Sequence, residues 1–335
     1  MQQLRLLLFP IAIIYDLVTR LRNWLFDNGI KHRQAFNIPV IAVGNLSTGG
    51  TGKTPMVEYL VTMQLDKKVA VLSRGYGRKT SGYREVTMNS TAAQVGDEPL
   101  QIKRKFGDAI MVAVCEKRVD GIRQLIADYP SDIMLLDDAY QHRYVKASYY
   151  ILLTSYDRPF YSDYVLPAGN LREARKGYQR AQSIVVTKCP PDLSNVDQQF
   201  IIKRIDPLPG QQIYFSYIKY GKKLLSINGV RELNDLSGKE VTIITGIAKP
   251  QPFIDHLNKW LIVDHLQYSD HHHFTTSEIE LFKSKDILIT TEKDFMRLID
   301  HQIPQLFYLP MEIAFIGDAL DLKCLKSPTE SSGKC

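Results

Sequence analysis

The 335-residue chain has few cysteines and no long hydrophobic run, and these absences exclude several classes of protein. Its cysteines, Cys115, Cys189, Cys324 and Cys335, form no C-x-x-C pair, so we expect reduced thiols in a cytoplasmic protein, without a disulfide framework or zinc site. The 42 lysines and arginines exceed the 36 aspartates and glutamates by six. This excess suits an anionic ligand or a membrane surface and is too small to indicate nucleic acid.

The N-terminal stretch has apolar residues at helical spacing, namely Leu4, Leu7, Ile11, Ile14, Val18, Leu21 and Leu25. Its longest unbroken apolar run, 6–15, is too short for a membrane span, which needs about 20 residues. No small-residue cleavage site of a signal peptide follows. Flanking arginines with Trp24 and Phe26 suit a helix lying in an anionic membrane interface, which we assign to residues 1–30. A helix packed on the protein's own core is the alternative.

Short apolar runs alternate with helix-like stretches from residue 38 onward, as in "IPVIAVG", "VAVLSRG", "AIMVAVC", "DIMLLDD", "YYILLTS" and "SIVVTKC". Such runs predict a doubly wound α/β domain with a mostly parallel sheet, which we place at 31–212. A second, smaller α/β domain is predicted at 213–312. Its first and last runs, 213–221 and 305–313, are expected to pair as a two-stranded connector. The tail, 313–335, is expected to return to the first domain.

The stretch "VGNLSTGGTGKTP" joins a predicted strand to a predicted helix through three glycines. It matches the phosphate-binding pattern G-x-x-x-x-G-K-[ST] except that Ser47 replaces the first glycine. Lys53 is expected to reach the β- and γ-phosphates, and Thr54 to ligate Mg²⁺. The sequence therefore predicts a P-loop NTPase whose nucleotide-binding residues are Ser47, Thr48, Gly49, Gly50, Thr51, Gly52, Lys53 and Thr54.

The doubled glycine resembles the variant loop of partition-type dimeric ATPases. The signature lysine of that class would fall at position 48, where this chain has Thr48. A partition-type nucleotide switch therefore stays as the alternative function. A GTPase ranks third, because "VVTKC" lacks the expected aspartate two residues after the lysine.

Two adjacent carboxylates, Asp137 and Asp138, follow the apolar run 133–136. This is the Walker B arrangement, in which a carboxylate orients the metal ion of a nucleotide; a helix N-cap is the alternative. Gln141 and His142 follow closely and are candidates to line the same site.

Other polar stretches are ambiguous on their own. Asp97 precedes Pro99 at a predicted helix start, where an N-cap is the ordinary explanation. Asp270 precedes three adjacent histidines, and an aspartate–histidine hydrogen bond explains this stretch better than a metal site. Arg172 and Arg175 could bind phosphate or lie on a solvated surface.

The ordered set of motifs resembles the tetraacyldisaccharide 4'-kinase family, also called the lipid A 4'-kinases. The motifs are "GNLSTGGTGKTP", "LSRGYGR", "GDEP", "CEKR", "LLDDAYQHR", "LREARKG", "SDHHHFT" and "TTEKD". Ala139 and Ala174 depart from the family pattern, which affects only loop shape.

This resemblance implies transfer of the γ-phosphate of ATP, with Mg²⁺, to the 4'-hydroxyl of a tetraacylated glucosamine disaccharide 1-phosphate. It implies a peripheral protein on the cytoplasmic face of the inner membrane, with a lipid substrate and no protein partner. It also implies that Lys53 is catalytic, that Asp97 is the base, and that His271 is the partner of Asp97. The residues it nominates to contact the substrate are Arg74, Arg118, Gln141, His142 and Arg172.

Overall fold

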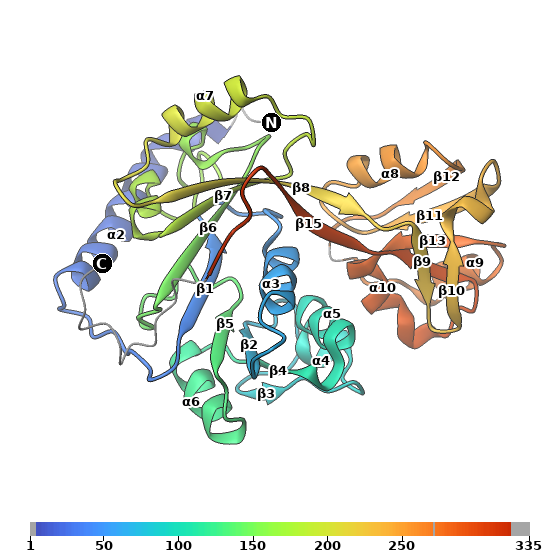
Figure 1. Ribbon diagram of the computed structural model, residues 1–335, viewed down its shortest axis with the longest axis horizontal. Coiled ribbons are helices and arrows are strands. Elements are labelled where there is room, and N and C mark those ends of the chain that lie inside the picture. The colour runs from blue at the N-terminus through green and yellow to red at the C-terminus, as the bar shows by residue number, and fades with distance from the viewer. Residues whose placement is uncertain (1–4, 271, 323–335) are drawn as a thin grey trace. The chain divides into compact units, whose positions relative to one another are not determined.

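The chain folds into two compact units, each built from segments that are distant in sequence (Figure 1). The computed structural model describes residues 5–270 and 272–322. Unit 1 comprises the described residues of Met1–Arg74, Ala109–Ile218 and Ile313–Cys335. Unit 2 comprises those of Gly75–Asp108 and Lys219–Glu312.

The predicted first domain, 31–212, differs from unit 1 because residues 75–108 group with unit 2. Within unit 2, helix α5 (Asp97–Phe106) packs against helix α10 (Glu292–Leu298) and buries apolar side chains such as Leu100. Burial of this apolar surface, rather than sequence proximity, decides where the segment belongs.

Unit 1 is built on a sheet whose strands follow the order β15-β8-β7-β6-β1-β5-β2-β4. From β8 to β4 every neighbouring pair is parallel, as the apolar runs predict. The strands are β1 (Val40–Asn45), β2 (Val69–Ser73), β4 (Ile110–Val114), β5 (Ile133–Leu136), β6 (Tyr149–Ser155), β7 (Ser183–Thr187), β8 (Gln212–Tyr220) and β15 (Met311–Ile316).

Parallel strands bring their carboxyl ends to one edge of the sheet, where ligands bind in open α/β folds. The P-loop follows β1, and Asp137 follows β5, its neighbour. β1 also passes close to the chain after β5: a Cβ at Gly44 would lie 2.7 Å from Cβ of Tyr140. Only glycine fits at position 44, so the sequence keeps these two site-bearing segments adjacent.

The helices of unit 1 are α2 (Phe9–Asp27), α3 (Lys53–Thr62), α6 (Arg118–Asp128) and α7 (Asn195–Ile205). Helix α3 packs on β1, and α6 packs on β2 and β4. The short 3-10 helices of the chain are η1 (Leu6–Leu8), η2 (Gly107–Ala109), η3 (Phe160–Ser162), η4 (Arg175–Arg180), η5 (Leu233–Leu236) and η6 (Ile299–His301).

Unit 2 contains a mixed sheet in the order β10-β9-β14-β13-β11-β12, with a core that includes Ile243, Leu257 and Ile289. Strands β11 to β14 pair in parallel, and the hairpin β9–β10 adds antiparallel pairs. The strands of this sheet are β9 (Lys223–Ser226), β10 (Gly229–Glu232), β11 (Glu240–Thr245), β12 (Ile262–Gln267), β13 (Leu288–Thr291) and β14 (Leu306–Leu309), and the helices of unit 2 are α4 (Ala92–Val95), α5, α8 (Gln251–Leu257), α9 (Thr276–Lys283) and α10. The two-residue strand β3 (Arg84–Glu85), also in unit 2, is not part of this sheet.

The predicted connector run, 305–313, is divided by Pro310 into β14 and β15. Proline has no backbone N–H and therefore interrupts a strand ladder. β14 belongs to the unit 2 sheet, whereas β15 is the neighbour of β8. In the described part of the tail, Leu320 is buried in unit 1 and its carbonyl accepts a hydrogen bond from Tyr59.

Helix α2 forms where the N-terminal pattern predicts one, with Pro10 in its first turn, where the missing N–H costs nothing. It buries only a narrow stripe, Ala12, Thr19 and Phe26. Its other apolar side chains are exposed, including Leu17 (61%) and Leu21 (58%). Among the described residues, no helix has the length and apolar character needed to span a membrane.

Candidate active site

The P-loop connects β1 to α3 through left-handed glycines. Gly49 has a φ of 105°, and Gly52, at the N-cap of α3, has a φ of 82°. A hydrogen bond links the start of the loop to its end: Nδ2 of Asn45 donates to Oγ1 of Thr51 at 2.7 Å. Lys188, which follows β7, donates to the carbonyl of Gly50 at 2.6 Å. The loop is therefore held at both sides before any ligand binds.

Lys53, Asp138 and Arg172 form a charged cluster beside this loop. Nζ of Lys53 lies 3.9 Å from the carboxylate of Asp138, and Arg172 contacts the same carboxylate at 2.9 Å. Arg172 also donates to the side chain of Asn45, the last residue of β1. Burial opposes ionisation of Asp138, but the charges of Lys53 and Arg172 outweigh it and lower its pKa to about 2. Asp138 is therefore ionised at neutral pH.

Asp137 is fully buried, and both its side chain and its backbone carbonyl accept hydrogen bonds. Its Oδ2 accepts a hydrogen bond from Ser73, the last residue of β2, at 3.1 Å. Arg118 donates to the carbonyls of Asp137 (3.1 Å) and Cys115 (2.6 Å). Burial lowers the pKa of the Arg118 guanidinium to about 10, although Asp137 and Asp138 stabilise its charge. Arg118 thus fixes the backbone of the carboxylate pair.

His142 is half-buried near the same charges. Burial, with the charges of Arg118 and Arg74, lowers its pKa to about 4, so the imidazole is neutral at pH 7. The side chain of Arg74 is exposed. A neutral imidazole can donate one hydrogen bond and accept another, and it adds no positive charge to a site already rich in cations.

Gln141 binds both the end of β1 and Glu173, a buried carboxylate that was not predicted from the sequence to be functional. Its Nε2 donates to the carbonyl of Asn45 (2.8 Å) and to Glu173 (3.0 Å). Glu173 is fully buried; burial raises its pKa, but Arg180 and its hydrogen bonds lower it below the usual value overall. Asn23 of α2 donates to Glu173 at 2.7 Å. Through Glu173 and Gln141, these contacts connect helix α2 to Asn45, the residue before the P-loop.

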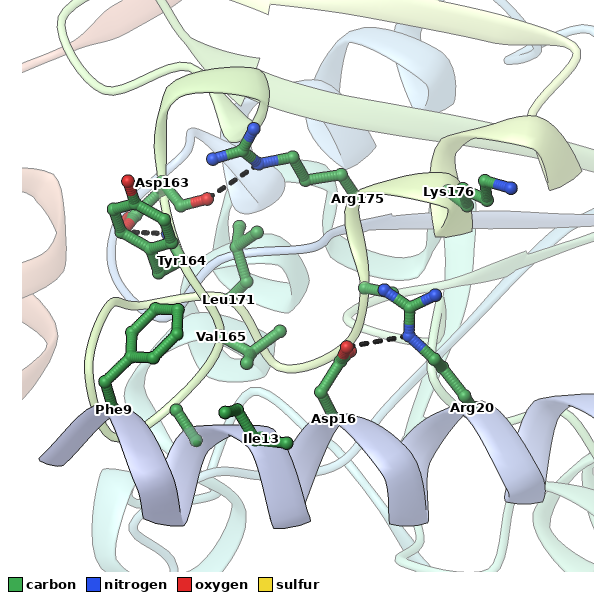
Figure 2. A pocket seen from close by; sticks show the side chains of 12 residues that line it. Phe9, Ile13, Asp16, Arg20, Asp163, Tyr164, Val165, Leu171, Arg175 and Lys176 are labelled. Atoms are coloured by element: carbon green, nitrogen blue, oxygen red, sulfur yellow. Dashed lines mark hydrogen bonds and ion pairs between the residues drawn. The ribbon is translucent and has the colours of Figure 1, made fainter.

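Helix α2 and the segment 163–176 line a cavity of about 310 Å³ that is open to solvent on one side. Figure 2 shows Phe9 of α2 directed toward Tyr164, whose ring it meets edge-on with 5.8 Å between the centroids, and Ile13 on the side of α2 that faces Val165. The remaining polar lining includes Arg20, which is ion-paired with Asp16, as well as Asp163, Arg175 and Lys176. The cavity combines an apolar interior with cationic side chains, and Arg175 lies here rather than in the P-loop cluster.

Asp97, in unit 2, is the first residue of α5, and the N-cap is Gly96, without a side-chain capping bond. The N-cap explanation of Asp97 is therefore wrong. Its carboxylate is ion-paired with Arg297 of α10, and Glu98 N–H donates to its Oδ1 at 3.1 Å. His271, its predicted partner, lies outside the described residues.

The site offers oxygen ligands for a magnesium ion. In the described part of the chain, no three His, Cys, Asp or Glu side chains are grouped to hold a metal ion by themselves. Nucleotide-bound Mg²⁺ does not need such a group, because it keeps several waters and uses one or two carboxylates with the phosphates. Asp137 and Asp138, with the hydroxyl of Thr54 in the first turn of α3, supply oxygen ligands of the kind that requirement names.

Known proteins are similar to this chain over almost its whole length. A family model described as tetraacyldisaccharide-1-P 4'-kinase matches residues 4–326. The tetraacyldisaccharide 4'-kinase of Flavobacterium johnsoniae is 46% identical over 323 residues, which cover 95% of this chain and 94% of the relative. That of Bacteroides thetaiotaomicron is 42% identical over 342 residues, which cover 94% and 90%.

One solved structure has the same fold. It is a crystal structure of LpxK from Aquifex aeolicus in complex with ATP, with 27% sequence identity and a TM-score of 0.76. The match covers 94% of this chain and 96% of that chain. The predicted fold class, a P-loop kinase with a parallel-rich sheet, is confirmed.

Proposed function

Because the chain belongs to the tetraacyldisaccharide-1-P 4'-kinase family, we propose that the residues gathered at its P-loop carry out phosphoryl transfer. The reaction moves the γ-phosphate of ATP to the 4'-hydroxyl of a tetraacylated disaccharide 1-phosphate in lipid A biosynthesis. Family membership sets aside the partition-type alternative. The observation that carries the site assignment is the cluster of Lys53, Asp138 and Arg172 beside the preformed P-loop.

Phosphoryl transfer needs positioned phosphates and neutralised charge more than covalent chemistry. We assign the β- and γ-phosphates to the backbone of the P-loop and to Lys53. Arg172 supplies a second cation close to Lys53, since both contact the Asp138 carboxylate. Mg²⁺ would be held by Thr54 and by Asp137 or Asp138, and when bound it supplies charge neutralisation at the phosphates.

The acceptor hydroxyl must lose its proton during transfer. We propose Asp97 as the base and His271 as its partner. Asp97 supports this role because its carboxylate is nearly buried, is fixed by hydrogen bonds and is not used as a helix cap. A base held in this way keeps its orientation without further ordering cost.

Activity assays separate this proposal from a switch. Radiolabelled ATP is incubated with the chain and an acylated disaccharide 1-phosphate in detergent micelles. We expect label in the lipid, in proportion to enzyme, and little ATP hydrolysis without acceptor. Hydrolysis at the same rate with and without acceptor, and no labelled lipid, would contradict kinase activity at this site.

We further propose that the exposed apolar face of α2 lies in the membrane interface, as a peripheral attachment on the cytoplasmic face of the inner membrane. An apolar helix face needs cover from water, and Arg20, Arg175 and Lys176 beside it suit anionic lipid headgroups. The cavity between α2 and the segment 163–176 gives the acylated substrate an apolar surface next to Arg172.

Replacing both Leu17 and Leu21 with glutamate should weaken binding to anionic vesicles by roughly a hundredfold or more, since each leucine that is buried in the interface contributes about 1.5–3 kcal/mol. Sedimentation with vesicles measures this, and ATP affinity should not change. The matched control changes Val196 and Phe200 of α7, which are also exposed (79% and 61%) and one turn apart. Equal loss of vesicle binding in both double variants would show general surface hydrophobicity instead of an interface helix.

Deleting α2 is a poorer test, because Tyr15 donates to the carbonyl of Arg172 and Asn23 donates to Glu173. Truncation would therefore disturb the active site together with the apolar face. The surface substitutions leave both hydrogen bonds in place.

A further inference from the structure

Unit 2 contains a nearly buried arginine whose guanidinium is directed at the proposed base. Nε of Arg297 donates to Oδ2 of Asp97 at 3.0 Å, and its NH2 contacts the same oxygen. The third nitrogen, NH1, donates to Asp294 at 2.8 Å and to the carbonyl of Gly246 at 3.1 Å. The side chains of Arg297 and Asp97 are only 10% and 6% exposed. Two N–H groups of the guanidinium fork therefore converge on one oxygen of Asp97, which fixes the position of that oxygen and places a positive charge beside it.

Arg297 is itself anchored from behind. Asp294, which is fully buried, accepts hydrogen bonds on Oδ2 from Gly246 N–H (3.0 Å) and from Thr291 Oγ1 (2.8 Å). A Cβ at Gly246 would lie 3.1 Å from the Asp294 carboxylate, so glycine allows this close approach. The ends of β11 and β13 therefore hold Asp294, Asp294 holds Arg297, and Arg297 holds Asp97.

The two oxygens of Asp97 accept hydrogen bonds from different residues. Oδ2 is bound by Arg297, and Oδ1 accepts the N–H of Glu98, so the carboxylate cannot rotate without breaking one of these bonds. A cation at this distance also favours the ionised form, which is the form that accepts a proton. Among the described residues of unit 2, the charged groups near this pair include Glu98 on α5, Lys293 and Asp294 on α10, and Asp270, whose charge reaches Lys293.

We propose that Arg297, anchored by Asp294, is a positioning residue for phosphoryl transfer: it orients the carboxylate of Asp97 and keeps it ionised. This inference rests on the proposed function of Asp97 as the base. Arg297 does not touch the reacting atoms in this scheme, so its effect must pass through Asp97.

The test compares Arg297→Gln, Asp97→Asn and the double variant in the lipid kinase assay across pH. Arg297→Gln should lower kcat about tenfold or more, but less than the roughly 10²- to 10⁴-fold expected for losing a general base. KM for ATP should stay within about twofold, because the proposed ATP contacts, the P-loop and Lys53, are left unchanged by this substitution. The acid limb of the kcat–pH profile should move up by about one pH unit, since a cation beside the base is removed.

The double variant decides whether Arg297 acts through Asp97. Its kcat should equal that of Asp97→Asn within about twofold, because residues that act as a unit are not additive. The positioning role would be overturned if Arg297→Gln lowered kcat by the same factor in the parent protein and in the Asp97→Asn variant, and left the acid limb of the kcat–pH profile in place. Full activity of Asp97→Asn would instead refute the base itself, so the two failures are distinguishable.

A matched control and a conservative variant keep the test decisive. Arg104→Gln removes another arginine of unit 2, which pairs with Asp300 at 4.0 Å, and it should leave the pH profile unchanged. Arg297→Lys keeps the charge but loses the fork, so it should lose less kcat than Arg297→Gln and leave the acid limb in place. If Arg297→Gln does not fold, as judged by melting, Arg297→Lys alone decides: its loss must vanish in the Asp97→Asn background.

Discussion

Replacing Lys53 with alanine is expected to lower kcat by about 10²- to 10³-fold, the typical effect of losing one preorganised charge at a transition state. Lys53 begins α3 directly after the P-loop, and its side chain is only 16% exposed. Its removal also leaves Asp138 with one cation fewer, so the carboxylate would repel the phosphates more strongly. Initial rates at saturating ATP and acceptor measure the effect.

The control for this variant is Lys67→Ala, which removes an exposed lysine of unit 1 that donates to Gln64. It should keep full activity. The melting temperature of Lys53→Ala should stay near that of the parent, because the ion pair with Asp138 is 3.9 Å long and partly exposed. Turnover within threefold of the parent would remove Lys53 from the mechanism.

The largest loss is expected for Asp97→Asn, about 10²- to 10⁴-fold in kcat, because an amide cannot accept the proton of the acceptor hydroxyl. The loss of a helix cap does not complicate this variant, since Gly96 is the N-cap of α5. The ion pair with Arg297 does, and we expect a lower melting temperature because a nearly buried guanidinium loses one of its two carboxylates.

Two measurements separate chemistry from stability in Asp97→Asn. ATP affinity should be unchanged, and the kcat loss should persist well below the melting transition. Asp108→Asn is the matched control: it removes a surface carboxylate of unit 2 that pairs with Lys103 at 3.0 Å. If Asp97→Asn keeps parental turnover, Asp97 only pairs with Arg297, and alignment with charge neutralisation is the whole mechanism.

The sequence alone predicts the parts of this protein whose signals are local. The apolar runs that form β1, β2, β4, β5, β6 and β7 are contiguous, so each strand could be located before the structure was known. The P-loop and the carboxylate pair after β5 are similarly local, because a strand end carries its polar residues to the sheet edge.

What the sequence could not predict depends on contacts between distant segments. Residues 75–108 group with unit 2 because α5 packs on α10, and no feature of the segment itself reveals that partner. Asp97 was assigned a capping alternative because its sequence context is that of a cap, whereas its charge is paired with Arg297. Arg297 lies three residues after the "TTEKD" motif, and no sequence pattern marks it as a functional residue. Its proposed role depends on contacts that only the folded chain makes.

The pairing of Asp97 with Arg297 also constrains the order in which the protein is made. The two residues are 200 positions apart, and residues 75–108 reach the ribosome exit long before 219–312. At about 5–20 residues per second, α5 waits roughly 10–40 s for α10 to be synthesised. Unit 2 therefore completes its fold only after α10 has been made, when most of unit 1 is already available, and a ribosome that stalls before residue 292 leaves α5 without its packing partner.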